Sequence, residues 1–240
     1  MTLRAILVDL GGTLVDYFGH TTPGLVLPRS LTLAGQLLLS VGIRVPPLAV
    51  LEARWSRNAQ SPDDPEVRPL EIRLRRTFEV DDSDSDLLPA LCRSFMAPLF
   101  AQARTYEDTL PFLDVLRDLG IRAVVVSNTT WGSPAELWRE QLSREGISSR
   151  IDGSVFCRDA GWRKPDPRIY AQALRAAGAD PGDCLFIGDN PVWDVEGPNK
   201  AGIRGMLLDR RMEFMGQGFD RVTCLREAVE KFSSENYGDI

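Results

Sequence analysis

The sequence predicts an α/β fold, with a doubly wound parallel-sheet core that carries an inserted α-helical segment. Three observations support this prediction. An apolar segment over 3–8 has the length of a buried strand and ends at Asp9. From Thr105 onward, helix-period and strand-like segments alternate, as in βα units that build a parallel sheet. Between 17 and 100 this rhythm is broken, and apolar residues recur at helical spacing instead.

The core elements follow from local patterns. After the first strand, we expect helices over 109–119, 134–145 and 166–178 and strands over 121–127, 153–157, 184–188 and 203–208. Ser133-Pro134 and Asp166-Pro167 each place an N-cap residue before a proline at the first helical position. We therefore assign 1–16 and 101–240 to the core.

The remaining segment, 17–100, is expected to form a helical cap. Its apolar residues repeat at helical spacing in 29–40, 48–57, 69–78 and 86–100, with loops rich in Pro, Asp and Ser between them. The acidic run over 81–86 lacks the glycine and the terminal glutamate of a calcium-binding loop. A solvated linker that ends in a helix cap is the favoured interpretation.

Charge, cysteine spacing and apolar runs limit the classes of partner and the cell compartment that we expect. The net charge is -6 and the arginines are scattered, which argues against nucleic acid or an anionic membrane as the main partner. The cysteines Cys92, Cys157, Cys184 and Cys224 form no CxxC pair, so we expect buried free thiols in a reducing cytosol. No signal peptide or transmembrane span is evident, which favours a cytoplasmic protein. The sequence indicates no oligomeric state.

Polar signals follow the predicted strands at the ends where parallel sheets bind ligands. One is a lysine placed just before a predicted helix, and the others come directly after strands. The set consists of Asp9, Ser127, Asn128, Lys164, Asp189 and Asp194. Each residue alone is common as a turn former, a cap or a helix start. Their joint order and spacing favour a single cleft in which all of them converge.

On these residues the chain resembles the haloacid dehalogenase-like (HAD) hydrolase superfamily. The resemblance rests on Asp9-Leu10-Gly11-Gly12-Thr13, Ser127, Lys164 and the stretch from Gly188-Asp189 to Asp194. It covers nearly the whole core. The placement of the helical segment between the first and second motifs is similar to the C1-cap branch, subfamily I. The resemblance implies a Rossmann-like core and a cap that closes over the cleft as a lid.

The resemblance also implies a Mg2+-dependent phosphatase that acts on a small phosphorylated metabolite. Asp9 would be the nucleophile that forms an aspartyl-phosphate, and Lys164 would neutralise Asp9 and the charge that develops on phosphorus. Ser127, Asn128 and Lys164 would bind the phosphate. Mg2+ would be held by Asp9, the backbone carbonyl of Gly11, Asp189 and Asp194.

Gly11 departs from the family pattern. In family phosphatases an aspartate at this position protonates the leaving alcohol and then activates water, a role worth roughly 10^2 to 10^4 in rate. Glycine can do neither. The chain could be a phosphatase for good leaving groups, such as acyl, enol or aryl phosphates, or it could recruit another acid. His20 and Asp16 are the candidates, although either could equally have a structural role.

Two other functions stay open. A binding or regulatory protein would keep the metal and phosphate site without turnover, but the intact remainder of the motifs counts against it. Dehalogenases use the same nucleophile on carbon, but they resemble Asp-x-Tyr-Gly-Thr and dispense with the metal-binding acidic pair, so Asp189 and Asp194 count against dehalogenation. Phosphonoacetaldehyde hydrolysis needs a cap lysine, and the lysines of this chain are Lys164, Lys200 and Lys231.

Two groups of side chains could contribute to specificity. Three tryptophans lie near different motifs and could form an aromatic wall for the leaving group, with loop packing as the alternative. They are Trp131, Trp162 and Trp193. Three arginines of a cap helix could reach an anionic substrate when the lid closes, with a solvated helix face as the alternative. They are Arg73, Arg75 and Arg76.

Overall fold

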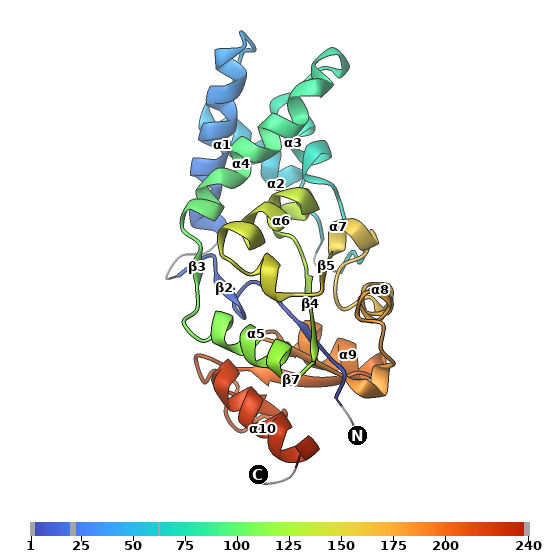
Figure 1. The fold of residues 1–240 in the computed structure, drawn as a ribbon. Helices are drawn as coiled ribbons and strands as arrows, with labels where there is room; N and C mark the ends of the chain where they lie inside the picture. The colour runs from blue at the N-terminus through green and yellow to red at the C-terminus, as the bar shows by residue number, and fades with distance from the viewer. Residues whose placement is uncertain (1–2, 20–22, 62, 238–240) are drawn as a thin grey trace.

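A six-stranded parallel sheet forms the centre of the molecule. The structure, a computed structural model, describes residues 3–19, 23–61 and 63–237 (Figure 1). The strand order is β5-β4-β1-β6-β7-β8. The strands are β1 (Ala5–Val8), β4 (Arg122–Ser127), β5 (Gly153–Phe156), β6 (Cys184–Gly188), β7 (Arg204–Leu208) and β8 (Arg221–Val222). The predicted doubly wound parallel sheet is confirmed.

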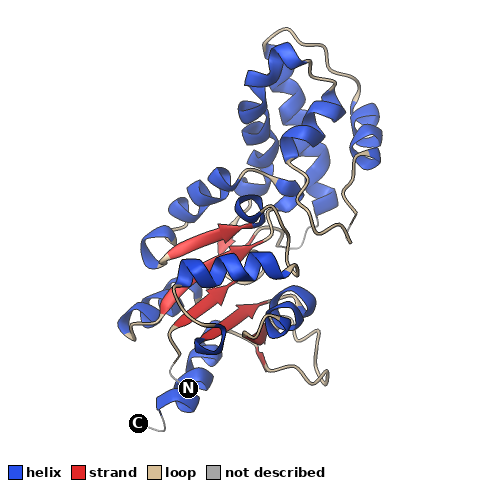
Figure 2. Ribbon diagram, turned by 90° about the vertical axis from the view of Figure 1, so that its right-hand side faces the viewer, coloured by secondary structure: helices blue, strands red, loops and turns tan. Residues whose placement is uncertain are grey.

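Helices cover both faces of this sheet (Figure 2). They are α5 (Thr109–Asp118), α6 (Ala135–Arg144), α7 (Cys157–Ala160), α8 (Pro167–Ala177), α9 (Gly197–Lys200) and α10 (Leu225–Tyr237). Alternate residues of β1 belong to different hydrophobic clusters, with Ile6 and Val8 in one and Ala5 and Leu7 in the other. Because successive side chains of a strand point to opposite faces, β1 is buried on both sides and is apolar throughout.

Proline-containing motifs start two core helices, in different ways. Asp166 caps α8 as predicted, because its carboxylate accepts a hydrogen bond from the backbone N–H of Arg168. The prediction for Ser133 is wrong: α6 begins one residue later, after Pro134, and the hydroxyl of Ser133 does not cap it. That hydroxyl instead accepts a 2.7 Å hydrogen bond from the indole N–H of Trp138.

Four further helices pack together beyond the sheet at one end of the molecule (Figures 1 and 2). They are α1 (Pro23–Ser40), α2 (Leu48–Arg57), α3 (Leu70–Phe78) and α4 (Leu88–Ala101). The chain leaves the core through β2 (Val15–Asp16) and returns through β3 (Arg104–Thr105), which pair antiparallel. The division at residues 17 and 100 stays a prediction. The antiparallel pair β2–β3 lies where the chain passes from the core into the helical segment and back.

The acidic run differs from its predicted role as a linker that ends in a helix cap. It forms a 3-10 helix over Asp82–Leu87 that leads into α4, and Leu87 stands at the N-cap position of α4 with no side-chain cap. All four cysteines are free, and every one except Cys224 is buried. Within the described ranges, no helix has both the length and the apolar character needed to cross a membrane.

Candidate active site

Strand pairing brings three polar side chains to one edge of the sheet. β1 lies between β4 and β6, and Val8 is level with Val125 on one side and Ile187 on the other. Asp9, Ser127 and Asp189 therefore all follow parallel strands at the same carboxyl edge. This is the place where ligands of open parallel sheets bind.

Lys164 links two of the acidic residues. Its ammonium lies 2.6 Å from Oδ1 of Asp9 and 2.7 Å from Oδ1 of Asp194, and the residue is 2% exposed. Burial disfavours the charged lysine, but the negative charges of Asp194 and Asp9 outweigh burial and raise the pKa of Lys164 above its usual range. The lysine therefore stays protonated between its two partners.

Asn128 positions Lys164 through the backbone. Its side-chain oxygen accepts a 2.8 Å hydrogen bond from the Lys164 N–H, and its side-chain nitrogen donates a 3.1 Å bond to the Lys164 carbonyl. The second N–H of the amide stays available, and Asn128 lines the cavity described below. The Ser127 hydroxyl makes only a 3.5 Å contact with the Asn128 carbonyl, so it is available to a ligand.

Three carboxylates form a compact oxygen cluster. Asp9, Asp189 and Asp194 each offer an oxygen, and these oxygens lie within 4.8 Å of one another. Burial, followed by the charges of Asp9 and Asp194, raises the pKa of Asp189 to about 8. Burial also raises the pKa of Asp194, to about 6, although Lys164 opposes the shift. One ammonium does not balance three clustered carboxylates, of which Asp9 and Asp194 are buried, so the cluster favours an additional cation.

Two glycines permit this close approach of acids. Gly12 has a φ of +81°, and a Cβ there would collide with the carboxylate of Asp189. A Cβ at Gly188 would collide with the side chain of Asp194. Gly12 and Gly188 are thus required by the geometry of the acidic cluster.

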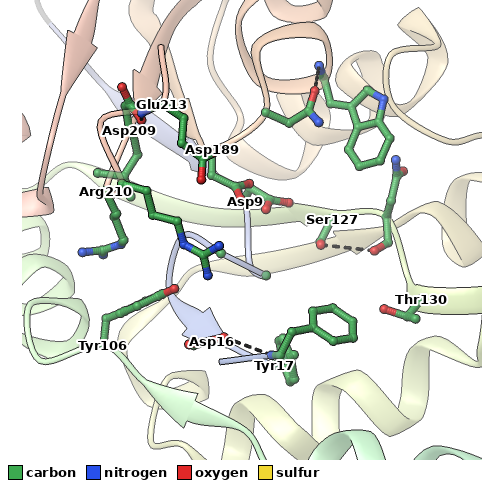
Figure 3. Close-up of a pocket in the computed structure, with 18 of the residues that line it drawn as sticks. Asp9, Asp16, Tyr17, Tyr106, Ser127, Thr130, Asp189, Asp209, Arg210 and Glu213 are labelled. Carbon is green, nitrogen blue, oxygen red and sulfur yellow. Dashed lines mark hydrogen bonds between the residues drawn. The ribbon is translucent and has the colours of Figure 1, made fainter. Parts of the chain in front are cut away.

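A cavity of about 420 Å³ opens in front of these acids (Figure 3). Its walls come from the ends of β1, β4 and β6, from the β2–β3 region and from the loop after β7. They include Asp9, Gly11, Asp16, Tyr17, Phe18, Tyr106, Ser127, Thr130, Asp189, Trp193, Asp209, Arg210, Arg211, Glu213 and Phe214. None of the described residues in α1–α4 lines this cavity.

The side chain missing at Gly11 leaves a position beside Tyr17. A Cβ at Gly11 would lie 3.6 Å from Cδ2 of Tyr17, an ordinary van der Waals contact. Asp16, a candidate acid, lines the cavity, but its Oδ1 accepts hydrogen bonds from the N–H groups of Phe18 and Gly19 at 3.0 and 2.6 Å. It therefore has a turn-forming role. His20, the other candidate, lies outside the described residues.

The tryptophans are divided between the cavity and the packing of loops. Trp193 lines the cavity, whereas Trp131 packs edge-on against Trp55 and Phe95, with centroid distances of 6.0 and 5.1 Å. Trp162 is stacked by the guanidinium of Arg168. The hypothesis of a three-indole wall is therefore wrong for Trp131 and Trp162. Sequence proximity to a motif did not reveal the direction of either ring.

The cap arginines also lie away from the cavity. Arg73 is 5% exposed and stacks on the Trp55 ring at 3.8 Å, and burial lowers its pKa to about 10. Neither Arg75 nor Arg76 lines the cavity. The sequence analysis missed Arg210 and Arg211, although they follow the predicted strand 203–208 and meet the same strand-end criterion as Asp9.

Comparisons with known proteins agree with this geometry. The haloacid dehalogenase-like hydrolase family matches residues 3–202. A glyceraldehyde 3-phosphate phosphatase of Methanopyrus kandleri is 30% identical over 60% of this chain and 59% of its own. A phosphoserine phosphatase of Thermus thermophilus is 30% identical over 56% and 54%, respectively. The chain thus spans somewhat more than half the length of these two relatives.

A dehalogenase shares a longer segment with the chain. The (S)-2-haloacid dehalogenase of Pseudomonas sp. strain YL is 30% identical over 67% of this chain and 74% of its own. Among solved structures, a HAD phosphatase from Thermococcus onnurineus has a TM-score of 0.67 at 19% identity, covering 96% of this chain and 98% of that one. A 2-haloacid dehalogenase from Pseudomonas syringae pv. Tomato DC3000 has a TM-score of 0.71 at 19% identity, covering 98% and 100%.

At 19% identity, the structural matches show a common fold only. The reaction has to be inferred from the residues of the site. The family match covers Asp9, Lys164, Asp189 and Asp194. These are the side chains that the structure brings together in one cluster. The chain belongs to the haloacid dehalogenase-like hydrolase family.

Proposed function

We propose that the protein is a Mg2+-dependent phosphatase that acts on a small phosphorylated molecule through an aspartyl-phosphate at Asp9. The observation that carries the proposal is the buried arrangement of Lys164 between Asp9 and Asp194, with Asp189 completing the oxygen cluster. A nucleophilic carboxylate needs a neighbouring cation to accept an anionic phosphate, and a purely electrostatic cluster of this kind suits phosphoryl transfer.

The donor set fits Mg2+. Three carboxylates with oxygens within 4.8 Å offer only hard ligands, and the raised pKa values of Asp189 and Asp194 indicate a deficit of positive charge. Asp9, the Gly11 carbonyl, Asp189 and Asp194 would hold the ion. When bound, it supplies charge neutralisation and polarises the phosphate.

The side chains of this chain then have distinct roles. A carboxylate oxygen of Asp9 attacks phosphorus, the bond from phosphorus to the leaving oxygen breaks, and its electron pair stays on that oxygen. The Ser127 hydroxyl donates to a phosphate oxygen, while Lys164 keeps Asp9 oriented. Water then attacks phosphorus, the bond to Asp9 breaks, and inorganic phosphate leaves with Asp9 restored.

Gly11 determines which leaving groups are tolerated. With no side chain there to deliver a proton, the leaving oxygen departs as an anion or takes its proton from water. We therefore expect turnover of acyl, enol and aryl phosphates to exceed that of alkyl phosphates by orders of magnitude.

The first test is Mg2+-dependent phosphate release from p-nitrophenyl phosphate, with Asp9→Asn as the blank. Release that disappears in EDTA and in the mutant supports the phosphatase. No release above the blank contradicts it. Stabilisation of the protein by Mg2+ plus a phosphate analogue without turnover would then favour a binding or regulatory protein.

One comparison favours a second candidate, 2-haloacid dehalogenation, because a relative of that name matches 74% of its own length. Attack of Asp9 on carbon would displace halide and would not need the acidic pair. Chloride release from (S)-2-chloropropionate in EDTA, lost in Asp9→Asn, would support this candidate over the phosphatase.

A further inference from the structure

The cavity has two chemically different sides. Figure 3 shows Ser127 and Thr130 on one side, Tyr106 and Arg210 on the opposite side, and Asp9 with Asp189 between them. A phosphate held by Asp9 and Ser127 would therefore direct the rest of its molecule across the cavity. The wall on the far side comes from the loop after β7 and from Tyr106.

Two adjacent arginines of that wall differ in their partners. Arg210 has a structural role, because its guanidinium pairs with Asp108 at 2.8 and 3.0 Å and donates to the Thr13 carbonyl at 2.9 Å. Arg211 also lines the cavity, but within the described ranges it pairs with no carboxylate. It donates to the backbone carbonyl of Gly19 at 3.2 Å, so it reaches across to the β2–β3 region. Its charge is available to a ligand.

Tyr106 offers a second donor beside Arg211. Its ring is fixed beneath the guanidinium of Arg210 at 4.0 Å, and Figure 3 shows its hydroxyl directed toward the cavity. Burial and then Asp16 raise the pKa of Tyr106, while Arg210 and, less strongly, Arg211 oppose the shift, so the phenol keeps its proton. Arg211 and Tyr106 together therefore present a cation and a neutral O–H donor to the same space.

Two acids that line the cavity, Asp209 and Asp16, are already occupied. Asp209 pairs with Arg221 at 3.2 Å and accepts the N–H groups of Glu213 and Phe214 at 2.8 and 3.0 Å. These bonds fix the loop that carries Arg211. Asp16, which belongs to β2 and also lines the cavity, accepts two backbone N–H groups with its Oδ1.

We propose that Arg211 and Tyr106 form a subsite for a carboxylate on the leaving group, so that the preferred substrates are phosphorylated acids. A singly charged carboxylate matches Arg211, which has no carboxylate partner among the described residues, better than a second phosphate would, because the cavity already holds several acids. The proposal rests on the phosphatase activity proposed above and names its substrate class.

The test compares aryl and enol phosphates that carry a carboxylate, the leaving groups that Gly11 tolerates, with their primary amides, which keep the shape and lose the charge. In the wild type, kcat/KM should favour the best acid over its amide about tenfold, as expected when one charge-assisted hydrogen bond is gained. Arg211→Gln should reduce this ratio to about one, and Tyr106→Phe should reduce it in part. Arg175→Gln is the matched control, because Arg175 is exposed on α8 and does not line this cavity.

A binding experiment separates failure of the subsite from failure of the phosphatase. Phosphonate analogues of the same acids and amides are titrated calorimetrically into wild type and Arg211→Gln with Mg2+ present. Tighter binding of the acid that is lost in Arg211→Gln supports the subsite. Equal binding of acid and amide to the wild type overturns it and leaves the phosphatase intact. If neither analogue binds and p-nitrophenyl phosphate is not hydrolysed, both proposals are overturned.

Discussion

At the scale of single residues, the site depends on one buried ammonium. Lys164 lies between two carboxylates that are themselves 6% and 0% exposed, so its charge is compensated and theirs are stabilised. Removing one member of such a cluster leaves buried charge without a partner, which costs more than the pair itself contributes. The sequence predicted that Lys164 would contact Asp9, but its contact with Asp194 depends on tertiary packing.

Replacing Lys164 with alanine should therefore affect stability as well as turnover. We expect a loss of about 3 kcal/mol, roughly 6–12 °C in Tm, when unfolding is measured in EDTA. Activity on p-nitrophenyl phosphate should fall at least a hundredfold. Lys200→Ala, at an exposed position on α9, is the control and should change neither quantity. An unchanged Tm for Lys164→Ala would contradict the buried ion cluster.

Gly11 offers a gain-of-function test. Its φ lies outside the left-handed region and a Cβ would meet Tyr17 at 3.6 Å, so Gly11→Asp should fold normally. The new carboxyl should raise kcat/KM for alkyl phosphates by about 10^2 and leave aryl phosphates nearly unchanged, because only poor leaving groups need a proton. Gly11→Asn has the same size without the acid. Equal rates for the Asp and Asn variants would show that no proton donor is missing.

At the scale of elements, the loop between α2 and α3 is bonded to the loop that carries Lys164. The N–H of Val67 donates to Gly161 at 3.0 Å, and the N–H of Arg163 donates to Pro65 at 2.8 Å. Gln60 organises this loop, because its side chain accepts from the N–H of Arg68 at 3.0 Å and donates to the carbonyl of Glu66. The helical segment thus supports the loop of Lys164 from outside the cavity.

Gln60→Ala should loosen this support. Losing its side-chain hydrogen bonds should speed hydrogen exchange at the amides of Val67 and Arg163 about tenfold, while amides of β1 stay protected. Exchange measured by mass spectrometry or NMR on the two proteins checks this. Equal exchange at these amides in both proteins would show that the loop is ordered without Gln60.

Elements differ in how well the sequence predicts them, for physical reasons. Strands such as Ala5–Val8 and Arg122–Ser127 are apolar because both faces are buried, so a short run of apolar residues identifies them. The two-residue strands Val15–Asp16 and Arg104–Thr105 carry no such pattern, because they exist only through their mutual pairing. The position of the loop after β7 could be inferred from the end of a strand. The sequence could not show that Arg210 pairs with Asp108 while Arg211 does not, because these contacts depend on residues far away in the chain.

At the scale of the whole molecule, the acidic cluster links stability to pH and metal. The pKa of Asp189 in the folded state, about 8, lies above that of an unfolded aspartate, about 3.9. The folded protein therefore binds more protons than the unfolded chain between these values. Its stability is greatest with Asp189 protonated and declines as pH rises from about 4 to about 8.

Mg2+ should reverse that decline, because a bound cation replaces the proton in neutralising the cluster. In EDTA we expect Tm to fall between pH 5 and pH 8.5, and the rise in Tm on adding Mg2+ should be larger at pH 8.5 than at pH 5. Asp189→Asn, which carries no titrating charge, should remove most of both effects and provides the baseline for all other groups. Thermal unfolding of the two proteins across this range, with and without Mg2+, measures the difference. If the two curves run parallel in EDTA, Asp189 is not the group that couples folding to pH, and the electrostatic argument for a cation in this cluster loses its support.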